Sequence, residues 1–110
     1  MYTRQTVAKA IEYLTWGFPD APYVEVEDVV DFLGEGERIL ETKLAEWYDE
    51  EELEILREAL DMETEAASIA AALAMDAKAD TYWIDVALEC LRDDAEVALR
   101  SWRRLHRHAD

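Results

Sequence analysis

The chain of 110 residues contains no glycine or proline after Gly36, although these residue types most often interrupt regular structure. All three glycines and both prolines lie before that point or at it. Beyond it, apolar residues recur at intervals of three and four, which is the period of an amphipathic helix. The sequence therefore predicts an all-α fold in which the last two helices are long.

The first of these two helices is predicted from Glu50 to Met75, about 39 Å at 1.5 Å per residue. Its start carries a capping box, with Asp49 as the N-cap and Glu52 three residues later. Two apolar faces follow, and its alanine-rich second half allows a neighbouring helix to approach closely. One face consists of Leu53, Leu56 and Leu60, and the other of Ile55, Ala59, Met62, Ala66, Ile69 and Leu73.

The last helix is expected to begin after Asp80 as its N-cap and to run to the end of the chain. Its apolar residues repeat with heptad spacing. A short connection over residues 76–79 makes the two long helices an antiparallel hairpin. We interpret the seam as the core of a bundle, and a dimerising coiled coil is the second interpretation. The seam consists of Ile84, Leu88, Leu91, Ala95, Ala98, Trp102, Leu105 and Ala109.

The N-terminal part is predicted to hold shorter helices. Residues 4–16 form the first, with Thr3 as the N-cap and with Gly17 and Pro19 as the stop. A short helix that Gly34 ends and a third over residues 37–48 follow. Residues 24–27 also alternate like a strand, but residues 28–31 break the alternation, so we favour helix. The first helix has one apolar face, formed by Val7, Ile11, Leu14 and Phe18.

Length and composition indicate one domain over residues 1–110, a compact bundle of four to five helices. A hydrophobic content of 51% is too high for a disordered chain, even at a net charge of -16. The start of the sequence shows no apolar export segment behind basic residues, and the single Cys90 cannot form an internal disulfide. We therefore expect a cytoplasmic protein.

Residue patterns that carry chemistry are scarce. Asp93 and Asp94 follow Cys90 by about one turn, whereas a reactive thiolate needs a positive neighbourhood, so a structural, half-buried cysteine is predicted. His106 and His108 are two residues apart, and a pair of ligands on one helical face is spaced by four. The Glu-x-x-His quartet of di-metal bundles and the calcium-loop pattern do not occur. The expectation is a non-enzymatic protein without catalytic residues, cofactor or metal.

Negative charge is concentrated between residues 16 and 65, which carry eighteen acidic and three basic residues. Within this block, carboxylates recur every three or four residues, which would place them on one helical face. Like charges at this spacing cost about 0.2–0.5 kcal/mol per pair, so helix stability does not explain them. We predict that this acidic face binds a partner. Its residues are Glu46, Glu50, Glu54, Glu58, Asp61 and Glu65.

From Glu50 to Glu65 the predicted helix carries about one net charge per 3.4 Å, similar to one nucleic-acid strand. The leading hypothesis is therefore an inhibitor or regulator that mimics DNA or RNA and binds a basic surface, expected on a nucleic-acid-binding protein. Direct nucleic-acid or membrane binding is not expected. Phage-encoded inhibitors of restriction or CRISPR machinery often have this acidic character, and the similarity here is one of composition.

Two other hypotheses stand beside this one. The first is a structural or accessory helical subunit, or an antitoxin-like partner, whose acidity mainly confers solubility. The second is adaptation to high salt, which eight arginines against three lysines support and the abundant aromatic residues oppose. The C-terminal stripe of Arg100, Arg103, Arg104 and Arg107 is expected to pair with the protein's own acidic face.

Overall fold

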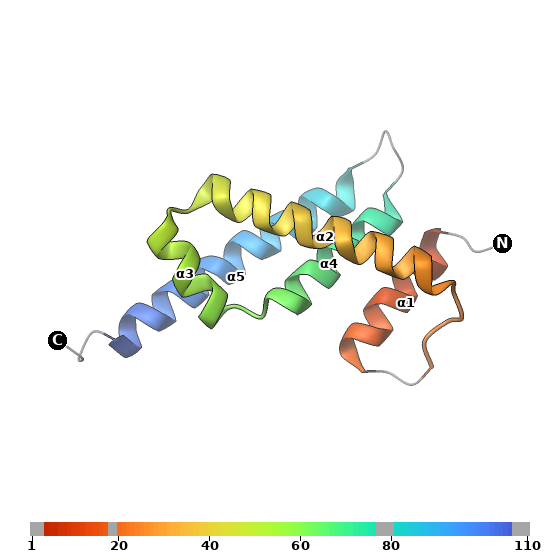
Figure 1. Ribbon diagram of the computed structural model, residues 1–110, viewed down its shortest axis with the longest axis horizontal. Coiled ribbons are helices and arrows are strands. Elements are labelled where there is room, and N and C mark those ends of the chain that lie inside the picture. Colours follow the sequence, from red (N-terminus) through yellow and green to blue (C-terminus); the bar gives the residue numbers. More distant parts are fainter. Residues whose placement is uncertain (1–3, 18–19, 77–80, 107–110) are drawn as a thin grey trace.

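The computed structural model describes residues 4–17, 20–76 and 81–106, and over these ranges it confirms an all-α bundle. Five helices and no strand are present in them (Figure 1). None of these helices is both long and apolar enough to cross a membrane. The helices are α1 (Arg4–Trp16), α2 (Val26–Trp47), α3 (Glu50–Ala59), α4 (Met62–Met75) and α5 (Tyr82–His106).

Helix α1 ends where the sequence predicts. Gly17 adopts a φ of 77°, which favours glycine, and its N–H donates to the carbonyl of Leu14 at 3.3 Å. Val7 and Ile11 are buried, as their spacing indicates, but 59% of Leu14 is exposed. The predicted cap Thr3, together with Phe18 and Pro19, lies outside the described residues.

The prediction of two helices separated at Gly34 is wrong, because α2 continues through both Gly34 and Gly36. Gly36 is buried against α4, where a side-chain Cβ would collide with the carbonyl oxygen of Ala66 and lie 3.1 Å from the Cβ of Ala70. This glycine therefore permits a close approach of two helices rather than ending one. The strand alternative is also wrong, since α2 begins at Val26.

The predicted single helix from Glu50 to Met75 is wrong as well, because it is divided into α3 and α4. Leu60 has extended backbone angles, and Asp61 caps the next helix. The Thr64 N–H donates to Oδ1 of Asp61 at 3.2 Å, and the Thr64 hydroxyl donates to Oδ2 at 2.9 Å. The turn lets α3 pack against α5, while α4 crosses between α1, α2 and α5 (Figure 1).

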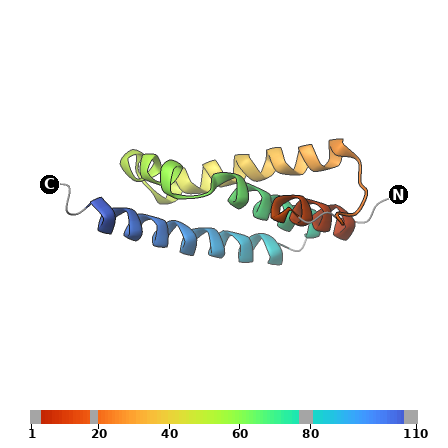
Figure 2. The ribbon, with the colours of Figure 1, turned by 90° about the horizontal axis from the view of Figure 1, so that it is seen from below.

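Helix α4 is the centre of the bundle. Half of its fourteen residues are buried, and six of these seven are alanines, so neighbouring helices approach its backbone closely. It contributes Ala66 and Ile69 to one core cluster, with α2, α3 and α5. It contributes Ala67, Ala70 and Ala71 to a second cluster, with α1. Figure 2 shows α5 along one side of the molecule and α2 along the other.

Helix α5 is long and runs back along α4 in the opposite direction, as predicted (Figure 1). Its heptad seam packs inside the bundle through Leu91 and Ala95, and the sequence pattern missed Leu99, which is also buried. Leu105 departs from the prediction because 78% of it is exposed. The predicted cap Asp80 and the last seam residue, Ala109, lie outside the described residues.

Candidate partner-binding surface

Helix α3 presents the most regular part of the acidic face. Its start has the predicted capping box: the Glu52 N–H donates to Asp49 Oδ1 at 2.9 Å, and the Asp49 N–H donates to Glu52 Oε1 at 3.2 Å. Glu50, Glu54 and Glu58 follow at steps of four and are exposed. No cation in the described part of the chain forms a salt bridge with these three, which we call the α3 row.

The other three predicted members do not extend this row. Glu46 lies on α2, where its Oε2 is 3.4 Å from Nζ of Lys43. Asp61 turns both carboxylate oxygens toward Thr64, and these hydrogen bonds lower the pKa of Asp61. Glu65 is half-buried on α4. The prediction that all of them share one helical face is therefore wrong, because the helix turns at Leu60.

Glu65 lies beside Asp94 of α5 and is not an ordinary surface carboxylate. Burial, together with the hydrogen bond and negative charge of Asp94, raises the pKa of Glu65 from 4.5 to about 8. At neutral pH the proton therefore stays on the Glu65 carboxyl group, beside Asp94. Glu65 is largely uncharged there and contributes little to an acidic surface.

This pair makes the stability depend on pH. Because the pKa of Glu65 is higher in the folded than in the unfolded chain, the folded state holds the proton more strongly. The stabilisation of the fold that results from this stronger proton binding is complete below about pH 4.5 and is lost as the pH rises through about 8. We expect Glu65→Gln to melt a few degrees above wild type at pH 9 and close to it at pH 5, as measured by circular dichroism.

Removing any charge from a protein of net charge -16 also reduces self-repulsion, so a matched variant is needed. Glu54→Gln removes one carboxylate from an exposed place on α3. Asp94→Asn should weaken the pH dependence only in part, because burial still raises the pKa of Glu65, whereas Glu54→Gln should follow the wild-type profile. Identical profiles for Glu65→Gln and Glu54→Gln would refute the raised pKa of Glu65.

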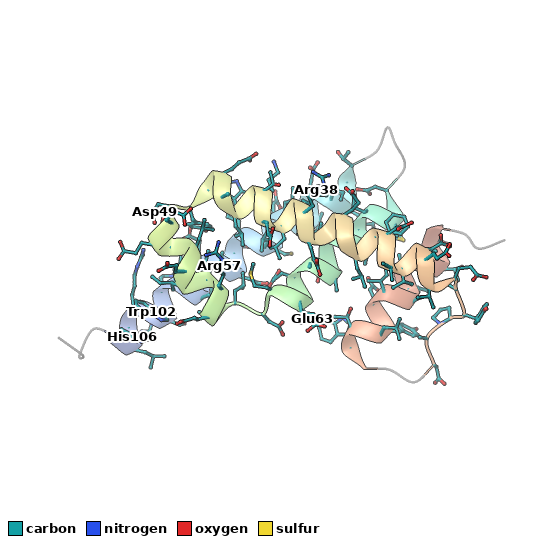
Figure 3. The ribbon with its side chains drawn as sticks, viewed as in Figure 1. Arg38, Asp49, Arg57, Glu63, Trp102 and His106 are labelled. Atoms are coloured by element: carbon teal, nitrogen blue, oxygen red, sulfur yellow. The ribbon has the colours of Figure 1, made fainter. Side chains whose placement is uncertain are left out.

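The fold brings a second group of carboxylates together that the sequence pattern missed. Glu37 and Glu41 on α2 lie near Glu63 at the start of α4, and these three line a depression of about 370 Å³. Glu37, Glu63 and Asp61 also line an adjoining groove of about 440 Å³ (Figure 3 labels Glu63). We call Glu37, Glu41, Asp61 and Glu63 the groove acids. The floor of the groove is apolar and includes Ile11, Leu14, Val29, Leu33, Ala66 and Ala67.

Sequence reasoning missed the groove acids because α2 and α4 meet only in the fold. Glu37 and Glu41 have the same four-residue spacing as the α3 row, so a search of each helix separately could have found that pair. Glu63 follows the cap Asp61 by two residues, as acidic residues often do in the first turn of a helix. The turn between α3 and α4 connects the α3 row to the groove acids.

Positive side chains lie on α5 and pair in part with the acidic helices. The guanidinium of Arg103 is 3.2 Å from Glu52 Oε2, so this arginine pairs with an acidic residue of the protein itself, but not with one of the six residues predicted to form the acidic face. Arg92 lies over the ring of Trp47, 5.5 Å from the ring centroid.

The end of α2 also contacts α5 through Tyr48. The Tyr48 hydroxyl donates to Glu96 Oε1 at 2.8 Å, and burial together with this bond raises the pKa of Tyr48 to about 12.

The residues considered for chemistry lie apart. Cys90 is exposed, so the prediction of a half-buried thiol is wrong. His106 stacks on Trp102, with ring centroids 3.9 Å apart, and its Nδ1 is 2.9 Å from the Trp102 carbonyl oxygen (Figure 3). His108 lies outside the described residues. Over residues 4–17, 20–76 and 81–106, no three His, Cys, Asp or Glu side chains are arranged to hold a metal ion.

The candidate surface therefore consists of the α3 row and the groove acids. Three of its residues are exposed on one helix, three more line a groove where α1, α2 and α4 meet, and Glu41 lines the depression beside that groove. Its chemistry suits the binding of positive groups through charge, with an apolar floor beside them. No protein-family model, curated protein or solved structure matches this chain.

Proposed function

We propose that this protein is a non-enzymatic inhibitor or regulator that binds a basic surface of another protein through the α3 row and the groove acids. The observation that carries the proposal is the α3 row itself, three exposed carboxylates at regular spacing without a salt bridge in the described part of the chain. Such carboxylates are available to a partner's lysines and arginines.

The charge density of α3 supports a nucleic-acid-binding protein as the partner. The helix has five acidic residues and one arginine, which gives about one net charge per 3.8 Å over its ten residues. One nucleic-acid strand carries a phosphate about every 3.4 Å. A groove that accepts DNA or RNA therefore has a complementary potential, and restriction and CRISPR nucleases belong to this class of partner.

Local stability does not account for the α3 row. Glu50 lies in the first turn, where the helix dipole stabilises an anion, but Glu54 lies in the middle and Glu58 near the end. At the end of a helix the dipole disfavours negative charge, and each like-charged pair costs about 0.2–0.5 kcal/mol. Acidic residues that destabilise their own helix are better explained by binding to a partner.

The test reverses the charge of the row without affecting a cap. In the double variant Glu54→Lys/Glu58→Lys, two attractions to a basic partner become repulsions, and we expect at least about a 100-fold loss of affinity. The control is Glu27→Lys/Asp31→Lys on α2, which changes the charge equally at the same spacing of exposed residues. Asp61 is left intact because its carboxylate caps α4.

Tagged wild-type protein and both variants would be used to capture proteins from the source cells, followed by titration of each captured protein. The proposal expects that wild type and the α2 control capture basic nucleic-acid-binding proteins and that the α3 variant does not. Competing DNA or RNA should displace the captured proteins. Capture of the same proteins by the α3 variant, or displacement by neither DNA nor RNA, would instead favour an accessory subunit whose acidity serves solubility.

A further inference from the structure

An exposed flank of α5, beside the pocket that this helix forms with the end of α3 and the start of α4, carries an apolar stripe. Cys90 and Val97 are seven residues apart and Leu105 follows eight later, so the three share a helical face. Cys90 is exposed, as are 53% of Val97 and 78% of Leu105. Figure 2 shows α5 lying by itself along one side of the molecule. The stripe borders the seam through Leu91 and Ala95 that packs inside the bundle, and Leu105 belongs to that seam by its spacing but is exposed.

Charge is divided unequally along the same helix. Residues 82–96 hold five acidic residues and one arginine, whereas residues 97–106 hold three arginines and no acidic residue. Two copies of α5 placed in parallel would bring like charges together. Two antiparallel copies would place each acidic half beside the basic half of the other, so the charges favour antiparallel self-association.

We propose that the protein forms a homodimer in which two α5 helices pair antiparallel, with Val97 of both copies near the twofold axis. A twofold interface uses the same residues on both subunits, which this arrangement satisfies. It places Cys90 of one copy within one residue of the level of Leu105 of the other. The stripe that is exposed in one chain is thereby covered by its counterpart.

The same alignment pairs the charges beside the stripe. Glu89, Asp93, Arg100 and Arg104 are separated by four, seven and four residues, so they follow one edge of the stripe. With Val97 at the centre, Asp93 lies within one residue of the level of Arg100 of the second copy, and Glu89 lies within one residue of the level of Arg104. None of these four side chains forms a salt bridge within the described part of its own chain.

Dimerisation brings together two chains of net charge -16, and this repulsion opposes association. The dimer is therefore expected to dissociate on dilution and to strengthen when moderate salt screens the long-range repulsion. The oligomeric state is best measured by sedimentation velocity over a concentration series at physiological ionic strength. A monomer throughout that series would overturn the proposal.

The first variant tests the centre of the interface. Val97→Asp places two carboxylates at the twofold axis, and we expect at least about a tenfold weaker dimer with unchanged melting, because Val97 is half exposed. Val30→Asp is the control, since Val30 is 58% exposed on α2 and lies away from α5. If both variants dimerise as wild type does, the α5 interface is wrong.

Disulfide trapping then tests the orientation. The variant Cys90→Ser/Val97→Cys should form a disulfide-linked dimer under mild oxidation, because two residues at the twofold axis face each other. Wild-type Cys90 should not, because antiparallel pairing separates the two thiols along the helices. Efficient crosslinking through Cys90 would show a parallel pair and would overturn the proposed arrangement. These tests do not depend on the partner proposed above.

Discussion

Replacing Gly36 by alanine is expected to destabilise the fold by about 1–2 kcal/mol. The new Cβ would collide with the carbonyl oxygen of Ala66 and lie 3.0 Å from the backbone nitrogen of Ala70. Backbone atoms cannot rotate away as a flexible side chain can, so α2 and α4 must separate along their contact. Overpacking of this kind costs about 1–3 kcal/mol, which exceeds the gain in helix propensity of alanine over glycine.

Gly34 provides the matched control, because it lies in the same helix and a Cβ there would meet nothing within 4 Å. Gly34→Ala should therefore stabilise the protein by about 0.5–1 kcal/mol, through helix propensity alone. Urea unfolding of both variants measures the two changes. Equal stabilisation by both substitutions would mean that α2 and α4 do not approach as closely as described.

The helical fold could be predicted because its signals are local. The capping box of Asp49 and Glu52, the stop at Gly17 and the period of the apolar residues depend on neighbours within one or two turns. Gly36 shows where local reasoning failed. The low helix propensity of glycine suggests that a helix ends at Gly36. The fold instead requires glycine there for the close contact with Ala66 and Ala70, which lie thirty or more residues away in sequence.

The break at Asp61 was missed although its signal is local. No glycine or proline marks it, and the apolar spacing continues through Met62 and Ala66, so periodicity alone predicts one helix. Asp61 as a cap, with acidic residues in the turn that follows, is a recognised helix start. A search for caps inside long periodic stretches would have found this break.

The candidate surface was only partly predictable for the same reason. Exposure of Glu50, Glu54 and Glu58 follows from their spacing on one helix. The raised pKa of Glu65 depends on burial and on Asp94, which approaches Glu65 only when α5 packs against α4. Periodicity identified the inner seam of α5 but also assigned Leu105 to it, and the exposure of Leu105 is seen only in the fold.

Replacing Asp76 by alanine is expected to destabilise the fold by about 2–4 kcal/mol. Asp76 ends α4 and is 6% exposed, yet its carboxylate caps the start of α5. The Trp83 N–H donates to Oδ1 at 3.0 Å, and the Ile84 N–H donates to Oδ2 at 2.8 Å. Hydrogen bonds to a charged group contribute about 1.5–3 kcal/mol, and alanine would leave both donors without this acceptor.

Asp85→Ala is the matched control, because it removes a carboxylate from the exposed first turn of the same helix. It should cost only about 0.3–1 kcal/mol, the usual contribution of an acidic residue to the dipole at a helix start. Asp76→Asn should fall between the two alanine variants, since its amide oxygen can still accept one N–H. Thermal melting checks this order, because Asp76→Ala should lower Tm by roughly 10 °C or more. If both alanine variants melt together, Asp76 does not hold α5 to the end of α4.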